Sequence, residues 1–395
     1  MSDHLQNDPL LRFRGEFPIL ERSTYMISNS LGAMPRGVYD SVHSYCDIWA
    51  QSGVRAWEEK WWMMAVEVGN ALGSIMNAPA GSVSLQLNVT SCQAVVASCL
   101  DFSGKRNKVV YSDMNFPSVM YFWEAQRSRG ARINMVRTDD GVHVPTDRLI
   151  DAIDEETLIV PVSHVVFRSS YIKDVKAIVE KAHKVGALVV LDAFQSLGNV
   201  PVDVQALNVD FAVGGVLKWL CGGPGTSYLY VKPELARKLE PGFTGWFAHE
   251  HPFAFEIGPT KYGEQPFKFM QGTSNVPGFY TALPGLKIIQ EAGVENIRAK
   301  SKRMTSRLIE LADQRGWKVN APRDAEQRGG TVAIDMPNSQ EVCQELLRRD
   351  VMVDWRPRAG VRFSPHFYNT MEEIDRAIQT VDEILSTMGA TTGAR

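Results

Sequence analysis

The chain has 395 residues and a formal net charge of −3. This length allows about two to three domains, and the near-neutral charge argues against nucleic acid or an anionic membrane as a partner. No apolar run approaches the roughly 18 residues of a membrane-spanning helix, and the first residues lack the basic and apolar regions of a signal peptide. Five cysteines without a CxxC pair predict no metal site and no disulfide framework, and they favour the reducing cytoplasm.

Short apolar runs through the first three quarters of the chain predict the strands of one sheet. In chain order they cover residues 83–87, 108–111, 157–162, 187–191, 209–213 and 227–231. Residues 172–185 have the apolar spacing of a helix. Near-continuous apolar strands that alternate with helices predict an α/β fold, in which helices cover both faces of a parallel or mixed sheet. Ligands bind beyond the carboxyl ends of such strands, which is where Asp192 stands.

The last hundred residues have a different pattern. A long helix is predicted over 294–316, followed by a strand, helix, strand, strand and helix at 331–336, 339–349, 351–355, 360–364 and 371–388. These elements indicate a small C-terminal α+β domain. We therefore expect three parts: an N-terminal arm with an active-site segment (1–45), a large cofactor-binding domain (46–285) and the small domain (286–395).

Asp192 and Lys218 carry the clearest chemical signal. The lysine follows the aspartate by 26 residues and lies between an apolar run and the glycine-rich GGPG turn. Pyridoxal 5′-phosphate (PLP) needs a lysine amine for its carbonyl and a carboxylate opposite its pyridine nitrogen. The alternative is a helix-capping aspartate and a surface lysine, but Lys218 precedes Trp219 and Leu220, which is a poor context for a surface residue.

Five further segments occur in a characteristic order: NSLGAMP (29–35), NFPS (115–118), GGPG (222–225), GWFAH (245–249) and VRFSP (361–365). Together with residues 191–225, they resemble the class V aminotransferase group of fold-type I PLP enzymes, and within it the kynureninases. The resemblance covers most of the chain. It implies a large domain with a mixed, mainly parallel seven-stranded sheet, a small α+β domain, PLP bound to Lys218 as a Schiff base, an amino-acid substrate and a homodimer with shared active sites.

The resemblance also implies roles for individual residues. In the cofactor site, the phosphate would lie at Thr90 and Ser91, the ring on Phe116 and beside Ser163, and the pyridine nitrogen and phenolic oxygen at Asp192 and Gln195. The neighbouring subunit would add Trp246 and Thr273, and the substrate would meet Asn29, Ser30 and Arg362. Simpler roles compete: a Ser/Thr helix cap, a core phenylalanine or tryptophan, and a surface ion pair for Arg362, with Arg356 and Arg358 as alternative substrate ligands.

Three positions depart from the kynureninase pattern. Leu217 replaces a tyrosine before the lysine, Val119 replaces an aspartate, and Gln195 replaces a histidine. Loss of an acid–base group typically costs about 10²–10⁴ in rate, although Tyr171, Tyr262 or Tyr368 could compensate. A desulfurase-type cysteine is missing from residues 356–360, and Cys343 is predicted to be a core residue of a helix.

Three functions therefore compete. The first is kynureninase-like cleavage of a β-acyl, possibly aromatic, amino acid. The second is a class V aminotransferase or a β-eliminating lyase with a different amino acid, which the lost acid–base groups favour. The third is a cofactor-binding protein without catalysis, which the presence of Asp192, Lys218 and Arg362 opposes.

Overall fold

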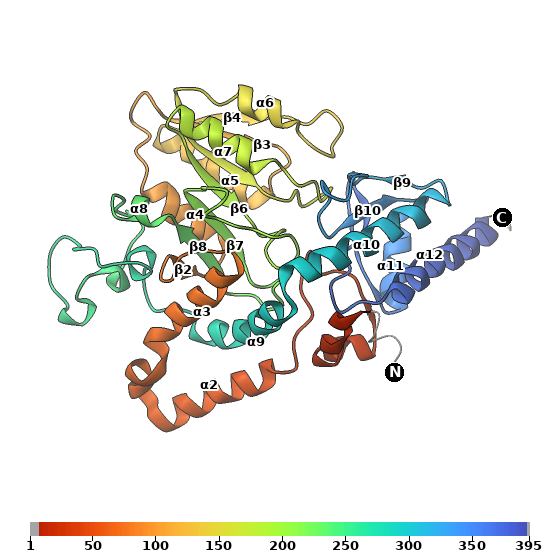
Figure 1. Ribbon diagram of the computed structural model, residues 1–395, viewed down its shortest axis with the longest axis horizontal. Helices are drawn as coiled ribbons and strands as arrows, with labels where there is room; N and C mark the ends of the chain where they lie inside the picture. The colour runs from red at the N-terminus through yellow and green to blue at the C-terminus, as the bar shows by residue number, and fades with distance from the viewer. Residues whose placement is uncertain (1–7, 393–395) are drawn as a thin grey trace.

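A computed structural model describes residues 8–392. Its largest element is a seven-stranded sheet with the order β2-β8-β7-β6-β5-β3-β4 (Figure 1). The strands are β2 (Val83–Gln86), β3 (Lys108–Ser112), β4 (Arg132–Val136), β5 (Thr157–Ser163), β6 (Leu188–Asp192), β7 (Phe211–Gly215) and β8 (Ser227–Val231). Strand β8 is antiparallel to both neighbours, whereas the other pairs are parallel. The predicted mixed, mainly parallel sheet is confirmed.

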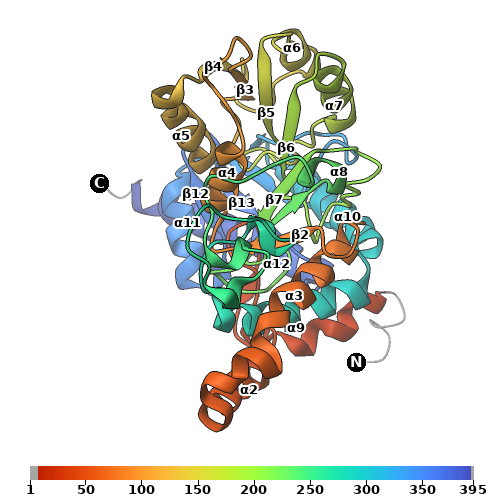
Figure 2. The ribbon, with the colours of Figure 1, turned by 90° about the vertical axis from the view of Figure 1, so that its left-hand side faces the viewer.

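Both faces of this sheet are buried except along the edge strand β4 (Arg132–Val136), which explains the continuous apolar runs of the other strands. Along β6, Val189 and Leu191 belong to one hydrophobic cluster, and Val190 belongs to another. The first cluster contains residues of α3 (Trp62–Ile75), α7 (Val175–Lys184) and α9 (Val276–Ala292), and the second contains residues of α4 (Val89–Ser98) and α5 (Pro117–Ala125). Figure 2 shows α5 and α7 on opposite sides of the strands.

The C-terminal residues form a second sheet with the order β12-β13-β10-β9. Its strands are β9 (Lys318–Val319), β10 (Val332–Asp335), β12 (Asp354–Arg356) and β13 (Gly360–Phe363), and its helices are α10 (Val294–Asp313), α11 (Ser339–Arg348) and α12 (Met371–Thr392). A separate hydrophobic cluster, which includes the buried Cys343, joins them. The prediction of Cys343 as a core residue is confirmed. Helix α10 leads from α9 to this sheet (Figure 1).

The predicted strand 351–355 is wrong as a single element. It divides at Val353 into β11 (Val351–Met352), which pairs in parallel with β1 (Thr24–Tyr25), and β12, which pairs with β13. The division arises because the N-terminal segment lies against the C-terminal part, where Arg14 forms an ion pair with Glu373 at 2.7 Å. Strand β4, which no apolar run predicted, is a half-exposed edge strand.

The three-part division of the chain stays a prediction. Helices α2 (Val38–Ser52) and α9 run across its two boundaries, at residues 45 and 285. Between residues 8 and 392, no helix combines the length and apolarity that crossing a membrane requires.

Candidate active site

A cavity of about 260 Å³ lies beside the carboxyl ends of β5 and β6. Six of the nine predicted cofactor-binding residues line it: Thr90, Phe116, Ser163, Asp192, Gln195 and Lys218. The remaining lining residues are Asn88, Val89, Ser118, Val119, Val165, Phe167, Phe194 and Leu217. Residues separated by up to 130 positions in the sequence therefore meet at the sheet edge where ligands bind in this class of fold.

Lys218 follows β7 and extends between two aromatic rings. Its Nζ lies 4.3 Å from the ring centroid of Phe194 and 5.5 Å from that of Phe116. The side chain keeps intermediate exposure because it lines the cavity. Burial nevertheless lowers the pKa of its amine to about 8, because the negative charge of Asp192, which opposes this shift, only partly compensates. A substantial neutral fraction near pH 8 suits a nucleophilic amine.

The backbone near Lys218 is fixed by a close approach of the NSLG segment. Gly32 donates its N–H to the Leu217 carbonyl at 2.7 Å. A Cβ on Gly32 would lie 2.1 Å from the Lys218 carbonyl oxygen. Any larger residue would therefore clash with the backbone at Lys218 unless one of the two segments moved. The glycine of this motif is therefore required by packing against the lysine segment.

Asp192 is the last residue of β6 and pairs in register with Ser163 of β5. Burial raises the pKa of its carboxyl, whereas the backbone N–H of Phe194, at 3.0 Å, and the charges of Lys218 and Lys173 lower it. Both lysine charges thus favour the ionised form, which is the form that pairs with a protonated ring nitrogen.

The opposite end of the cavity lies at the first turn of α4. Asn88 caps this helix, because its side chain accepts from the Ser91 N–H at 2.9 Å and from the Ser91 hydroxyl at 3.2 Å. Thr90 lines the cavity directly, whereas Ser91 lines a neighbouring cavity of about 190 Å³. Asn88 therefore takes the helix-cap role that was the simpler expectation for Thr90 and Ser91, and the N–H groups of the first turn can still attract an anion.

Gln195 uses its amide to join two other predicted segments. Its Nε2 donates to the Asn29 carbonyl at 2.9 Å, and its Oε1 accepts from the Trp219 indole at 3.1 Å. One Nε2 hydrogen remains for a ligand. Asn29 and Ser30 do not line the cavity. The Asn29 side chain is buried, and its amide atoms have no hydrogen-bond partner among residues 8–392.

Arg362 approaches this site from β13. Its guanidinium is bonded to Asp354 and, through Nη1 at 2.7 Å, to the carbonyl of Phe167, which lines the cavity. The ion pair is buried rather than on the surface. Arg356, one predicted alternative, is exposed and bonds to the same Asp354 at 3.0 Å.

Trp246 and Thr273 do not line the cavity of Lys218. Trp246 is 39% exposed and packs among Trp62, Phe253 and other aromatic rings. Thr273 lines the smaller cavity beside Ser91. Their predicted role as contacts to the partner's cofactor stays a prediction.

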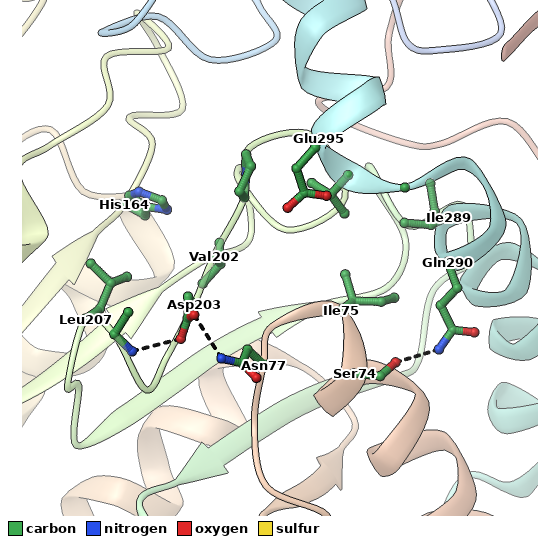
Figure 3. A pocket seen from close by; sticks show the side chains of 14 residues that line it. Ser74, Ile75, Asn77, His164, Val202, Asp203, Leu207, Ile289, Gln290 and Glu295 are labelled. Atoms are coloured by element: carbon green, nitrogen blue, oxygen red, sulfur yellow. Dashed lines mark hydrogen bonds between the residues drawn. The ribbon is translucent and has the colours of Figure 1, made fainter. Parts of the chain in front are cut away.

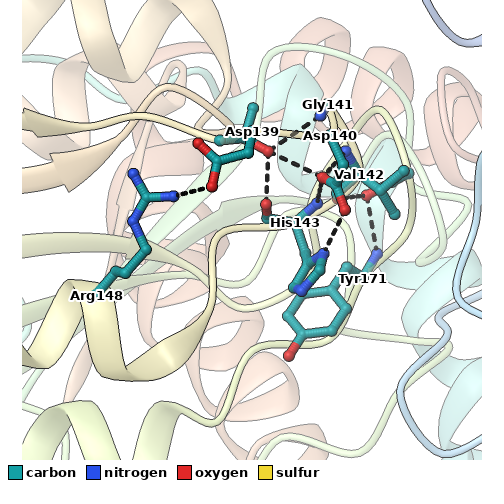
Figure 4. A network of polar contacts seen from close by, with 9 residues as sticks. Asp139, Asp140, Gly141, Val142, His143, Arg148 and Tyr171 are labelled. Atoms are coloured by element: carbon teal, nitrogen blue, oxygen red, sulfur yellow. Dashed lines mark hydrogen bonds and ion pairs between the residues drawn. The ribbon is translucent and has the colours of Figure 1, made fainter.

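Leu217 and Val119, two of the departures from the kynureninase pattern, both line the cavity. None of the three tyrosines considered as substitutes does so. Tyr262 donates to the Pro241 carbonyl and Tyr368 shares a hydrogen bond with Ser28. Tyr171 packs on His143 beside a loop that Asp140 organises (Figure 4). The missing acid–base groups are therefore not replaced by these residues.

Sequence reasoning missed four residues near the site. Lys173 is buried and donates to the Ser112 hydroxyl at 2.8 Å. Phe194 contacts the Lys218 amine, Asp354 orients Arg362, and Arg168 follows Phe167. An apolar sequence context identified Lys218, but Lys173 precedes an aspartate and lacks that signal.

A larger cavity, of about 660 Å³, lies at the ends of α3 and α9 and the start of α10 (Figure 3). Hydrogen bonds from Asn77 to Asp203 and from Gln290 to Ser74 connect side chains in its wall. It shares no lining residue with the Lys218 cavity, and its lining includes no lysine or arginine. Although this cavity is larger, it lacks the cationic side chains that would attract an anionic cofactor.

The sequence matches the family Aminotransferase class-V over residues 67–377. An uncharacterised aminotransferase of Bacillus subtilis (strain 168), YcbU, is 32% identical over 375 residues, which cover 94% of this chain and 96% of that protein. A kynureninase of Shouchella clausii (strain KSM-K16) is 29% identical and covers 96% and 92%. The solved apo structure of a cysteine desulfurase from Thermococcus onnurineus NA1 has a TM-score of 0.85 at 22% identity, covering 95% of this chain and 98% of that one.

The chain therefore belongs to the class-V aminotransferase family, and its fold is that of fold-type I PLP enzymes. The predictions of a PLP-dependent enzyme and of PLP as its cofactor are confirmed. At 22% identity, the likeness to the desulfurase concerns the fold alone.

The residues around the cavity fit PLP chemically. Lys218 supplies an amine, Asp192 a buried carboxylate, Phe116 an aromatic face, and Thr90 a hydroxyl at the positive end of α4. These groups are the set that a carbonyl, a pyridine nitrogen, an aromatic ring and a phosphate require.

Proposed function

We propose that this protein transfers an amino group between an amino acid and an oxo acid, with PLP held at Lys218. One observation carries the proposal. Of the fourteen residues that line the cavity, Asp192 and Lys218 are the two with ionisable carboxyl or amine groups. A reaction that one amine can catalyse therefore suits this site better than one that needs a further acid.

PLP supplies an electron sink that stabilises negative charge on the carbon next to the substrate amine. The chain's residues would hold and orient the reactants. Asp192 would pair with the ring nitrogen, Phe116 would cover one ring face, and α4 would hold the phosphate. Arg362 would bind the α-carboxylate, because a planar guanidinium matches a carboxylate in two hydrogen bonds.

Amino transfer requires one proton to leave the substrate carbon and one to be added nearby. The Lys218 amine can do both, because its pKa is lowered to about 8 and it exchanges protons readily near neutral pH. Hydrolytic cleavage of a side-chain bond needs a proton donor for the departing carbon as well. Leu217 stands where the kynureninase pattern places a tyrosine, and its side chain has no proton to donate.

Kynureninase-like cleavage of a β-acyl, possibly aromatic, amino acid is the second candidate. The 29% identity to a kynureninase over 394 residues supports it. Three phenylalanines, Phe116, Phe167 and Phe194, line the cavity and would suit an aromatic side chain. A β-eliminating lyase is a third reaction of this class that would also need one base.

The three reactions release different products. The purified enzyme with PLP would be given a panel of amino acids with an oxo acid, and the new amino acid measured by chromatography. With kynurenine as substrate, anthranilate fluorescence would measure kynureninase-like cleavage. Without an oxo acid, ammonia release would measure β-elimination. Lys218→Ala is the inactive control. Amino transfer alone supports the proposal, whereas anthranilate or ammonia as the main product contradicts it.

We also propose a homodimer in the cytoplasm. Exposed apolar side chains at Trp246, Phe253, Phe255 and Ile257 support an interface with a second copy. The five cysteines are free, as is usual in a reducing compartment. Light scattering after size-exclusion chromatography tests the assembly, and an active monomer would contradict the expected sharing of Trp246 and Thr273.

A further inference from the structure

Two arginines lie where the two sheets of the molecule meet beside the cavity. Arg168 directly follows Phe167, a cavity-lining residue, and its guanidinium carbon lies 5.5 Å from the Phe167 ring centroid. Arg358 lies in the turn between β12 and β13 with a φ of 65°. The hydrogen bond from Arg362 to the Phe167 carbonyl, at 2.7 Å, joins these two segments. Arg168 thus directly follows the cavity residue that Arg362 contacts, and Arg358 lies in the turn of the hairpin that carries Arg362.

These two arginines differ from their neighbours in lacking a hydrogen-bond or ion-pair partner among residues 8–392. Arg356 and Arg362 both bond to Asp354. For Arg168 and Arg358, no hydrogen bond or ion pair to any residue from 8 to 392 is present. Arg168 is half-buried, and Arg358 is exposed. Partial burial of a guanidinium without a hydrogen-bond acceptor costs free energy. An acceptor from a bound ligand would offset this cost for Arg168.

The charges around Arg168 also favour an anion. Burial lowers the pKa of its guanidinium, and the positive charges of Arg358 and Arg362 lower it further, while Asp113 raises it. The positive charges of Arg358 and Arg362 therefore repel the Arg168 guanidinium. A bound anion would relieve this repulsion, as opposite charge favours the ionised form of a group.

We propose that Arg168 and Arg358 bind a second carboxylate of the substrate, so that the enzyme prefers dicarboxylic amino acids and oxo acids. This inference rests on the proposed amino transfer, in which Arg362 holds the α-carboxylate. Guanidinium groups match carboxylates through two parallel hydrogen bonds. Because Arg168 follows β5 and Arg358 belongs to the small sheet, a substrate with two carboxylates would join both parts of the molecule.

A binding experiment tests this without turnover. Glutarate and valerate have five carbons and no amino group, so neither reacts. Their affinities for the PLP-loaded enzyme would be measured by calorimetry. We expect glutarate to bind at least about tenfold more tightly than valerate, and Arg168→Gln and Arg358→Gln each to remove most of this preference. Arg132→Gln is the matched control, because Arg132 is exposed on the edge strand β4 and pairs with Glu156.

Kinetics give a second readout. In the two variants, the KM for glutamate or aspartate should rise about tenfold or more, while kcat/KM for alanine stays unchanged. Circular dichroism checks the fold. If Arg168→Gln is unstable, Arg168→Lys takes its place, and it should keep only part of the preference because it keeps the charge and loses the planar fork.

Equal affinity for glutarate and valerate would overturn the inference, as would a preference that both variants retain. A stronger preference for O-phosphoserine than for glutamate would overturn the assignment to a carboxylate. Failure of the proposed function is distinguishable: glutarate preference without amino transfer refutes the reaction and keeps the site, whereas transfer with alanine but without glutarate preference keeps the reaction and refutes the site.

Discussion

Asp354 holds Arg362 through both of its carboxylate oxygens. Oδ1 accepts from the Arg362 Nε at 2.8 Å, and Oδ2 accepts from Nη2 at 2.5 Å. The two residues lie opposite each other in the β12–β13 register. This bidentate pair fixes the direction of the guanidinium. One hydrogen on Nη1 and one on Nη2 bond to neither Asp354 nor Phe167, and these two could bind a substrate.

Asp354→Asn should weaken both stability and substrate binding. The change removes the negative charge beside a buried cation, and breaking such a pair costs about 3–5 kcal/mol. We expect a lower free energy of unfolding in urea and a KM for the amino acid raised about tenfold or more. Asp335→Asn, on the exposed end of β10, is the control. An unchanged KM would mean that the direction of Arg362 does not matter for substrate binding.

Leu217→Tyr should raise the rate at which the protein cleaves kynurenine. The side chain at this position lines the cavity, so a tyrosine would place a proton donor beside Lys218. If the missing acid limits cleavage of kynurenine, anthranilate release should increase by about 10²-fold or more. Leu217→Phe, which adds the ring without the hydroxyl, separates acid catalysis from shape. Equal rates in the two variants would remove the acid–base explanation.

Lys173→Met should stabilise the protein at neutral pH. Burial lowers the pKa of Lys173 from 10.5 to about 8, which corresponds to about 3 kcal/mol. Between these pH values the unfolded chain binds more protons, so this lysine makes stability rise with pH from about 8 to 10.5, and its destabilising effect is complete below 8.

The variant should therefore gain up to about 3 kcal/mol at pH 7 and lose this rise with pH. Urea unfolding from pH 6 to 10.5 measures both effects. Lys176→Met, on the exposed face of α7, should change neither. A loss of stability at pH 7 would show that the hydrogen bond to Ser112 outweighs the cost of burying the charge.

Covalent cofactor uptake by the apoenzyme should depend on pH through Lys218. Because its pKa is lowered to about 8, the neutral amine fraction should increase as pH rises through about 8 and reach a plateau above it. Stopped-flow absorbance after mixing with PLP measures this rate. Asp192→Asn should move the midpoint to lower pH, because the carboxylate charge favours the protonated amine. A midpoint near 10 in the natural chain would contradict the burial of this amine.

The predicted fold was confirmed because its signals are local. Continuous apolar runs such as Leu188–Leu191 show that both faces of a strand are covered. The short run at 351–355 misled the prediction, because its division at Val353 depends on β1, which comes from the other end of the chain. Strand β4 was missed because an edge strand buries little apolar surface.

The sequence by itself determined the chemical core of this protein. The spacing of Asp192 and Lys218 and the order of the surrounding motifs indicate the cofactor, because a PLP site depends on a few residue types at the ends of neighbouring strands. Tertiary structure alone decided which charges are paired. It shows that Asp354 holds Arg362, that Lys173 is buried with its charge acting on Asp192, and that Arg168 and Arg358 have no hydrogen-bond or ion-pair partner among residues 8–392. Such pairings join segments that are far apart in the sequence, so no short stretch of sequence predicts them.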